Sequence, residues 1–118
     1  MTILVQEVNH EDQRYNTVGD WQFFDYLLHI KVSKMTDKRH VYLVAIHEII
    51  EATLCHFMGI SEEAVDEYDM NYKGNAEPGD QPEAPYYIQH KFATMVEKKM
   101  AKLMEVDWKE YEKEINNL

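Results

Sequence analysis

The sequence predicts an α+β fold, in which a short N-terminal antiparallel sheet of two to three strands packs with a central helix and two to three further helices. Residues 3–8 and 21–32 are rich in β-branched and aromatic side chains, which favour strands. Residues 41–58 form a run of helical length that is apolar on nearly every side, as in a helix inside a fold. The 118 residues suffice for one domain, spanning 1–118, with a single modest core.

The strand predictions rest on side-chain pattern. Trp21–Phe24 and Leu27–Val32 are joined at Asp25-Tyr26, which indicates a β-hairpin. In the second of these segments apolar and wetter residues alternate, so one face is expected to be buried through Leu28, Ile30 and Val32. Residues 3–8 would supply a further strand.

Capping residues predict the helix boundaries. Asp37 is a good N-cap for the central helix, and Gly59 is a good residue to follow its end at Met58. Ser61 caps a second, short helix that is expected to end near Tyr68 or Met70. Asp107 caps a final short helix.

Between these helices the sequence predicts a loop and a long helix. Asn71–Pro85 contains glycines and prolines and reads as a long irregular loop, a kind of segment that often carries function. Tyr86–Met104 has helical periodicity, and its apolar stripe is expected to form the core side of the helix through Phe92, Val96, Met100 and Leu103.

One face of the central helix is polar and ionisable. At about 100° per residue, His47, Glu48, Glu51 and Cys55 fall within one arc of roughly 100°, whereas His56 points elsewhere. Carboxylates are rarely buried unless they are paired or bind a metal. A helix with one solvent-facing stripe and no metal would give the same pattern, but the flanking apolar residues favour a recess.

The motif on this face is HExxE. It resembles the HExxH helix of zinc proteases with the second histidine replaced by Glu51. His47 and Glu51 lie one turn apart and would be metal ligands. The resemblance implies that Glu48 is the general base that takes a proton from water at the metal.

A third ligand is expected from the long helix. Two histidines and one glutamate with an open fourth position is a known catalytic zinc composition, so His90 would complete the set. A histidine at a helix interface without metal is the alternative reading of His90. Glu97, seven residues later on the same edge, would orient His90 or serve as a fourth ligand. Cys55 is the only cysteine, and a small buried apolar role is favoured for it over a thiolate ligand.

The order of strands, HExxE helix and His90 helix is similar to a small zincin-type arrangement. The strings HEIIEATLC, EPGDQPEAPY and HKFATMVE also resemble a family of small phage and bacterial proteins of uncharacterised function, from Gly19 to Tyr111. That resemblance implies no particular substrate.

Charge and the other histidines exclude several roles. A net charge of −10 argues against nucleic-acid binding, which needs clustered Lys and Arg. No apolar stretch is long enough for a membrane span and no signal peptide is recognisable, so a cytoplasmic protein is expected. The remaining histidines are expected at the surface: His10, His29, His40 and His56.

Three functions compete. The first is a metal-dependent hydrolase, zinc-dependent and peptidase-like, acting on a small or extended substrate or working as a homodimer. The second is a non-enzymatic, phage-type module for protein binding or assembly, with the acidic surface and the Trp108/Tyr111 helix meeting a partner. The third is an all-α nucleotide pyrophosphatase that uses magnesium and the ExxE-type spacings of Glu48/Glu51 and Glu110/Glu114, although His47 is a poor magnesium ligand.

Overall fold

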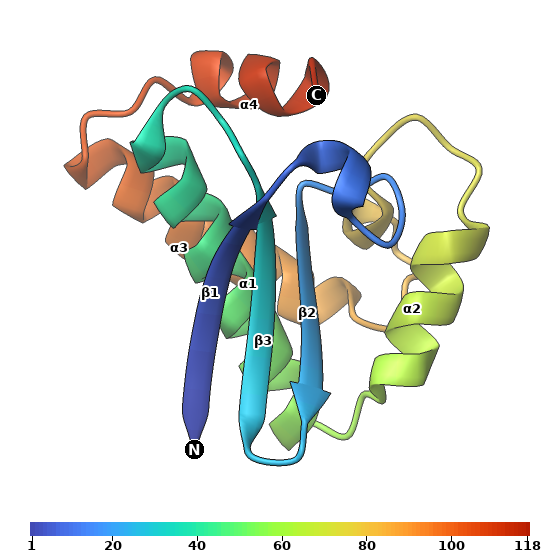
Figure 1. Cartoon of the computed structure of the whole chain (residues 1–118). Coiled ribbons are helices and arrows are strands. Elements are labelled where there is room, and N and C mark those ends of the chain that lie inside the picture. The colour runs from blue at the N-terminus through green and yellow to red at the C-terminus, as the bar shows by residue number, and fades with distance from the viewer.

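The structure, a computed structural model that describes residues 1–118, contains a three-stranded sheet and four α-helices (Figure 1). The predicted α+β class and its short N-terminal sheet are confirmed. The elements are β1 (Thr2–Val8), β2 (Gly19–Phe24), β3 (Leu27–Ser33), α1 (Lys38–Phe57), α2 (Glu62–Asn71), α3 (Tyr87–Leu103) and α4 (Trp108–Asn116).

The sheet is mixed, where the sequence predicted an antiparallel one. Its strand order is β1-β3-β2. The predicted hairpin of β2 and β3 is present, with Asp25 at φ 50° in its turn, but β1 pairs parallel with β3. The connection 9–18 carries the chain past β3 to its other edge, so β3 becomes the central strand. Its alternating residues are the buried ones, as predicted: Leu28, Ile30 and Val32.

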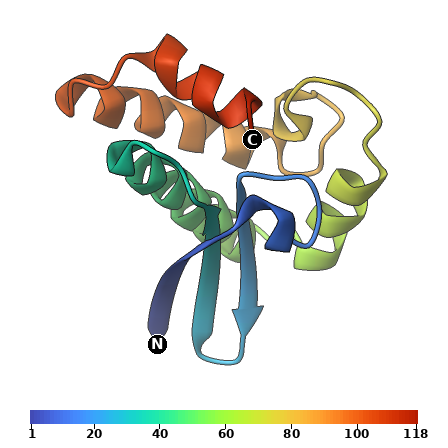
Figure 2. The same ribbon diagram turned by 45° about the horizontal axis from the view of Figure 1, so that its top comes forward.

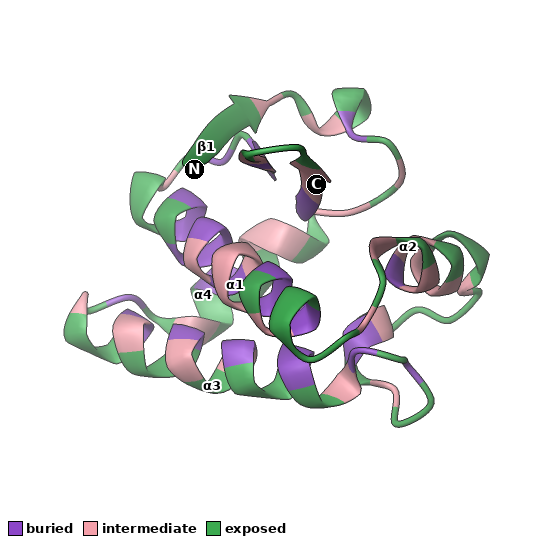
Figure 3. Cartoon of the chain, turned by 90° about the horizontal axis from the view of Figure 1, so that it is seen from below, coloured by how far each residue is buried: buried purple, intermediate pink, exposed green.

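The helices form further layers on one side of the sheet. Helix α1 packs on β2 and β3, and α3 packs on α1 (Figures 1 and 2). Seen from below, α1 lies between the sheet and α3 (Figure 3). The side of α1 that points away from the sheet therefore faces α3. No helix is both long enough and apolar enough to cross a bilayer.

The predicted boundaries of α1 are confirmed. The Asp37 side chain accepts a hydrogen bond from the Arg39 N–H at 2.9 Å and caps the first turn. Gly59 follows the helix end at φ +76°, a conformation that glycine adopts without steric cost. The Ile60 N–H reaches back to the Cys55 carbonyl at 2.9 Å.

The predicted core stripe of α3 is wrong at its two ends. Phe92 is 47% exposed and Leu103 is 82% exposed. Val96 and Met100 are half-buried. The buried side of α3 consists instead of small and polar residues: Gln89, His90, Ala93, Glu97 and Ala101. Apolar periodicity misled because α3 packs against the polar face of α1, where its own polar residues find partners and its alanines permit close approach.

Candidate metal centre

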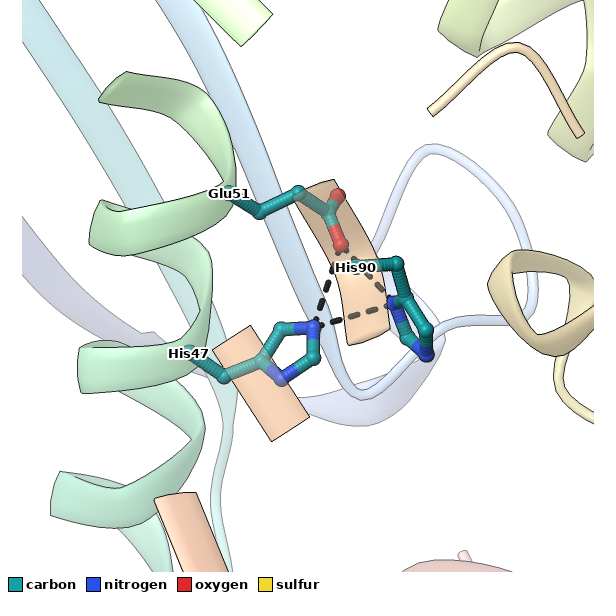
Figure 4. A group of neighbouring side chains, drawn as sticks. All are labelled: His47, Glu51 and His90. Atoms are coloured by element: carbon teal, nitrogen blue, oxygen red, sulfur yellow. Dashed lines mark hydrogen bonds and ion pairs between the residues drawn. The ribbon is translucent and has the colours of Figure 1, made fainter. Parts of the chain in front are cut away.

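Three buried side chains from two helices converge on one point. His47 and Glu51 come from α1 and His90 from α3, and Figure 4 shows them pointing toward one another. His47 Nε2 lies 3.1 Å from Glu51 Oε2 and 3.1 Å from His90 Nδ1, and the latter two atoms are 2.9 Å apart. Ligands of a tetrahedral zinc ion at about 2.0–2.1 Å would be roughly 3.3 Å apart. The three donors are therefore spaced nearly as such a site requires.

Hydrogen bonds alone satisfy this triangle poorly. An imidazole N–H points in one direction, whereas each atom here has its two neighbours about equally near. A cation at the centre would accept a lone pair from all three atoms at once. The donor set of two nitrogens and one carboxylate oxygen suits zinc and other divalent transition metals.

Each converging residue is fixed through its other polar atom. His47 Nδ1 lies 2.7 Å from Glu97 Oε1. Trp21 Nε1–H donates to Glu51 Oε1 at 3.0 Å. His90 Nε2 lies 3.2 Å from Asp80 Oδ1. Partners of this kind orient the ligands in known metal sites and set the histidine tautomer.

Glu97 takes neither of the two roles that the sequence suggested, which were to orient His90 or to be a fourth ligand. It contacts His47, where the prediction paired it with His90, and it does not belong to the converging group. Its second oxygen, Oε2, accepts a short hydrogen bond from the hydroxyl of Tyr111 on α4. A chain of contacts thus runs from Tyr111 through Glu97 to His47.

Glu48 lies beside the group without joining it. The residue is half-buried and lines the same cavity as His47 and His90. A Cβ on Gly19 would lie 2.5 Å from Glu48 Oε1, so the glycine leaves the room that this carboxylate occupies. Burial, and next the charge of Glu51, raise the pKa of Glu48 well above its usual value. A carboxyl group with a raised pKa is suited to accept a proton near neutral pH.

Without a metal, the converging residues shift one another's pKa values. Burial opposes a charge on His47, but hydrogen bonds to Glu51 and Glu97 outweigh it and raise its pKa well above the usual value. Burial likewise acts against an ionised Glu51, yet hydrogen bonds with His47 and His90 bring its pKa down to about 2. Glu51 is therefore ionised, as a ligand must be.

A groove leads away from the cluster. It has a volume of about 370 Å³. Its walls come from α1, from residues 90–98 of α3, from α4, from Thr17 and Val18 before β2, and from the loop segments Asn75–Glu77 and Asp80. The long loop expected at Asn71–Pro85 therefore does line the cavity, and it includes a 3-10 turn at Pro78–Asp80.

The other candidate residues lie outside the cluster. Cys55 is fully buried among core residues, and burial raises the pKa of its thiol to about 12. His56 is exposed, as predicted. His40 was predicted at the surface but is buried, with Nδ1 2.6 Å from Glu114 Oε1. That contact engages Glu114, and the mixed sheet rules out the all-α fold of a pyrophosphatase.

The remaining two histidines are half-buried, and each makes a hydrogen-bond contact with a polar side chain. His10 contacts the Ser33 hydroxyl at 2.8 Å, and His29 contacts Gln6 at 3.0 Å. Neither lies in the cluster.

Three residues that support the cluster were given no such role by the sequence: Trp21, Asp80 and Tyr111. Each lies on a different element from the side chain that it contacts: Trp21 in a strand, Asp80 in a 3-10 turn and Tyr111 in the terminal helix. No spacing rule connects such positions.

A scan against models of known protein families finds no match for the chain, and no curated protein or solved structure matches it either. The chemistry of the centre therefore rests on its own residues.

Proposed function

We propose that the chain is a zinc-dependent hydrolase that cleaves an amide or peptide bond. The observation that carries the proposal is the spacing of the three donor atoms, at 2.9–3.1 Å from one another, each on a side chain whose other polar atom is held. The likeness of HEIIE to the zinc-protease helix supports the reaction class.

Each residue has one task in this reaction. His47, Glu51 and His90 would hold the ion. A bound zinc ion would polarise the substrate carbonyl and lower the pKa of a bound water toward about 7. The Glu48 carboxylate would accept a proton from the attacking water as the bond between the water oxygen and the carbonyl carbon forms; the C–N bond would then break and Glu48 would pass the proton to the leaving amine. Three protein ligands leave the fourth position open for chemistry.

The groove limits the substrate. A volume of about 370 Å³ lies at the low end of the range for small-molecule sites. It admits a small amide or a short extended peptide. The acidic groups Glu48, Glu77 and Asp80 line it near the cluster and would favour a free amino group there.

Metal content tests the proposal without a substrate. Protein purified without a histidine tag should bind about one equivalent of zinc by elemental analysis. His47→Ala and His90→Ala should lose it. His56→Ala removes an exposed histidine of α1 and should keep it. Zinc at 100 times its Kd should also stabilise the parent by about 2.7 kcal/mol, and should leave His47→Ala unchanged.

Two results would contradict the proposal. If the protein stays metal-free after incubation with zinc, the proposed metal centre is wrong, and the alternative of a non-enzymatic protein-binding module is favoured. Zinc-loaded protein that cleaves none of a mixture of short synthetic peptides and amides, followed by mass spectrometry, would retain the centre and remove the hydrolase.

A further inference from the structure

Strand β1 is an edge strand with apolar residues exposed on both of its faces. Ile3, Leu4 and Val5 are 43%, 45% and 42% exposed. The strand pairs only with β3, and its other edge faces outward in two views (Figures 1 and 2). Residues 2–6 contain no charge and no proline. Natural edge strands usually carry such devices against pairing with another chain. Residues 2–6 lack them, and the one charged residue of β1 is Glu7, near its end.

The direction of its main-chain groups follows from two hydrogen bonds. The Thr2 N–H donates to the Tyr26 carbonyl at 2.8 Å, and the Val8 carbonyl accepts from the Lys34 N–H at 2.8 Å. Even-numbered residues of β1 therefore direct their N–H and C=O toward β3. Because these groups alternate along a strand, Ile3, Val5 and Glu7 direct theirs to the free edge.

We propose that β1 pairs antiparallel with β1 of a second copy about a two-fold axis at Leu4. This register places Ile3 opposite Val5 of the other copy as a hydrogen-bonded pair. It places Leu4 opposite Leu4 as a non-hydrogen-bonded pair. Both assignments agree with the alternation found above. Thr2 would lie opposite Gln6, so within residues 2–6 polar residues face polar residues and apolar residues face apolar ones, and Glu7 lies outside this segment, opposite Met1.

Self-complementarity identifies the second copy as the occupant. The segment TILVQ of β1 places like beside like when paired with itself in this register, which is the condition for an isologous two-fold contact. Each copy carries a net charge of −10, and the repulsion between two copies is weakest where the contact surface is uncharged, as it is at residues 2–6. The acidic helix α2 lies at the other side of the molecule from β1 (Figure 1).

Sedimentation or light scattering of the full chain tests the proposal. The parent should have twice the chain mass of 14.1 kDa. Leu4→Lys should be monomeric, since two like charges would face each other at the axis. Leu103→Lys is the matched control: it makes the same change at another exposed leucine, on α3, and should remain dimeric. Circular dichroism confirms that each variant is folded.

Cross-linking tests the register. In a Cys55→Ala background, Leu4→Cys should form an intermolecular disulfide, because Cα atoms of a non-hydrogen-bonded pair lie about 4.5 Å apart, within the disulfide range. Ile3→Cys should not, because its equivalent is offset by two residues along the strand, beyond about 7 Å. A monomeric parent, a dimer that survives Leu4→Lys, or equal cross-linking at both positions would overturn the proposal. None of these results bears on the metal centre.

Discussion

Glu48 and Glu51 have the same chemistry and different surroundings. Glu51 Oε2 lies 3.1 Å from His47 Nε2 and 2.9 Å from His90 Nδ1, and Glu51 is ionised by those contacts. Glu48 lies outside the converging group and its pKa is raised by burial. Under the proposed function, the Glu51 carboxylate holds the ion and the Glu48 carboxylate moves the proton.

We therefore expect different losses from the two amide variants. Glu51→Gln should lose zinc, because a neutral amide is a weaker ligand than a carboxylate. Glu48→Gln should retain about one equivalent and lose about 10²–10⁴-fold in turnover, the usual contribution of a general base. Elemental analysis of both variants beside the parent measures the first difference. Loss of zinc from Glu48→Gln alone would reverse the assigned roles.

Trp21 is expected to act on zinc through Glu51. Trp21→Phe removes the indole N–H that donates to Glu51 Oε1 at 3.0 Å. Zinc affinity should fall about 10–100-fold, as is typical when an orienting partner is lost. Trp108→Phe makes the same change at a tryptophan of the groove wall that makes no hydrogen bond to the three converging residues, and serves as control. Equal affinities in a competition assay with a chelating dye would show that the indole does not position Glu51.

At the scale of elements, the cluster depends on how closely the loop approaches α3. The 3-10 turn at Pro78–Asp80 passes over the His90 ring, and a Cβ on Gly79 would lie 2.4 Å from His90 Cγ. Glycine is needed here for space. The same turn places Asp80 Oδ1 3.2 Å from His90 Nε2, so the loop both covers and orients the histidine.

Gly79→Ala should therefore displace either the turn or the His90 ring. We expect zinc affinity to fall by about tenfold or more, since ligand and partner are both disturbed. Gly74→Ala is a control in the same loop, because its Cβ would meet the hydroxyl tip of Tyr72, which can rotate away. Calorimetric titration of both variants with zinc measures the difference. A loss equal in the two would indicate general loosening of the loop.

Across the whole molecule, Asp69 joins three segments that are distant in sequence. It lies on α2 and accepts hydrogen bonds from the hydroxyls of Tyr15, in the loop after β1, and Tyr86, before α3. Burial raises its pKa to about 6, although both hydrogen bonds act in the opposite direction. The folded protein thus holds a proton on Asp69 more tightly than the unfolded chain does.

This difference predicts a pH dependence of stability. A pKa above the unfolded value contributes stability that is present below about pH 4 and is lost as pH rises through about 6, at about 1.4 kcal/mol per unit of pKa difference. In Asp69→Asn, which cannot ionise, this loss should be absent. Urea unfolding of metal-free parent and variant between about pH 4 and pH 7 measures it. A difference in the free energy of unfolding between parent and Asp69→Asn that stays constant with pH would contradict the raised pKa. Glu67→Gln, on the same helix, is the control for the loss of a charge.

The sequence by itself determined the local features of this protein. Asp37, Gly59, Ser61 and Asp107 mark helix ends because capping depends on residues one turn apart. The polar face of α1 could also be read from the sequence, because a helix fixes which residues share a side. His47 and Glu51 were paired on that ground.

Only the tertiary structure decided which segments meet. Parallel pairing of β1 depends on a connection whose path no local pattern specifies. The buried side of α3 is polar because its partner face on α1 is polar, so apolar periodicity selected Phe92 and Leu103 wrongly. Trp21, Asp80 and Tyr111 complete the surroundings of the cluster from three distant segments. Such contacts depend on distance in space, which spacing along the chain does not determine.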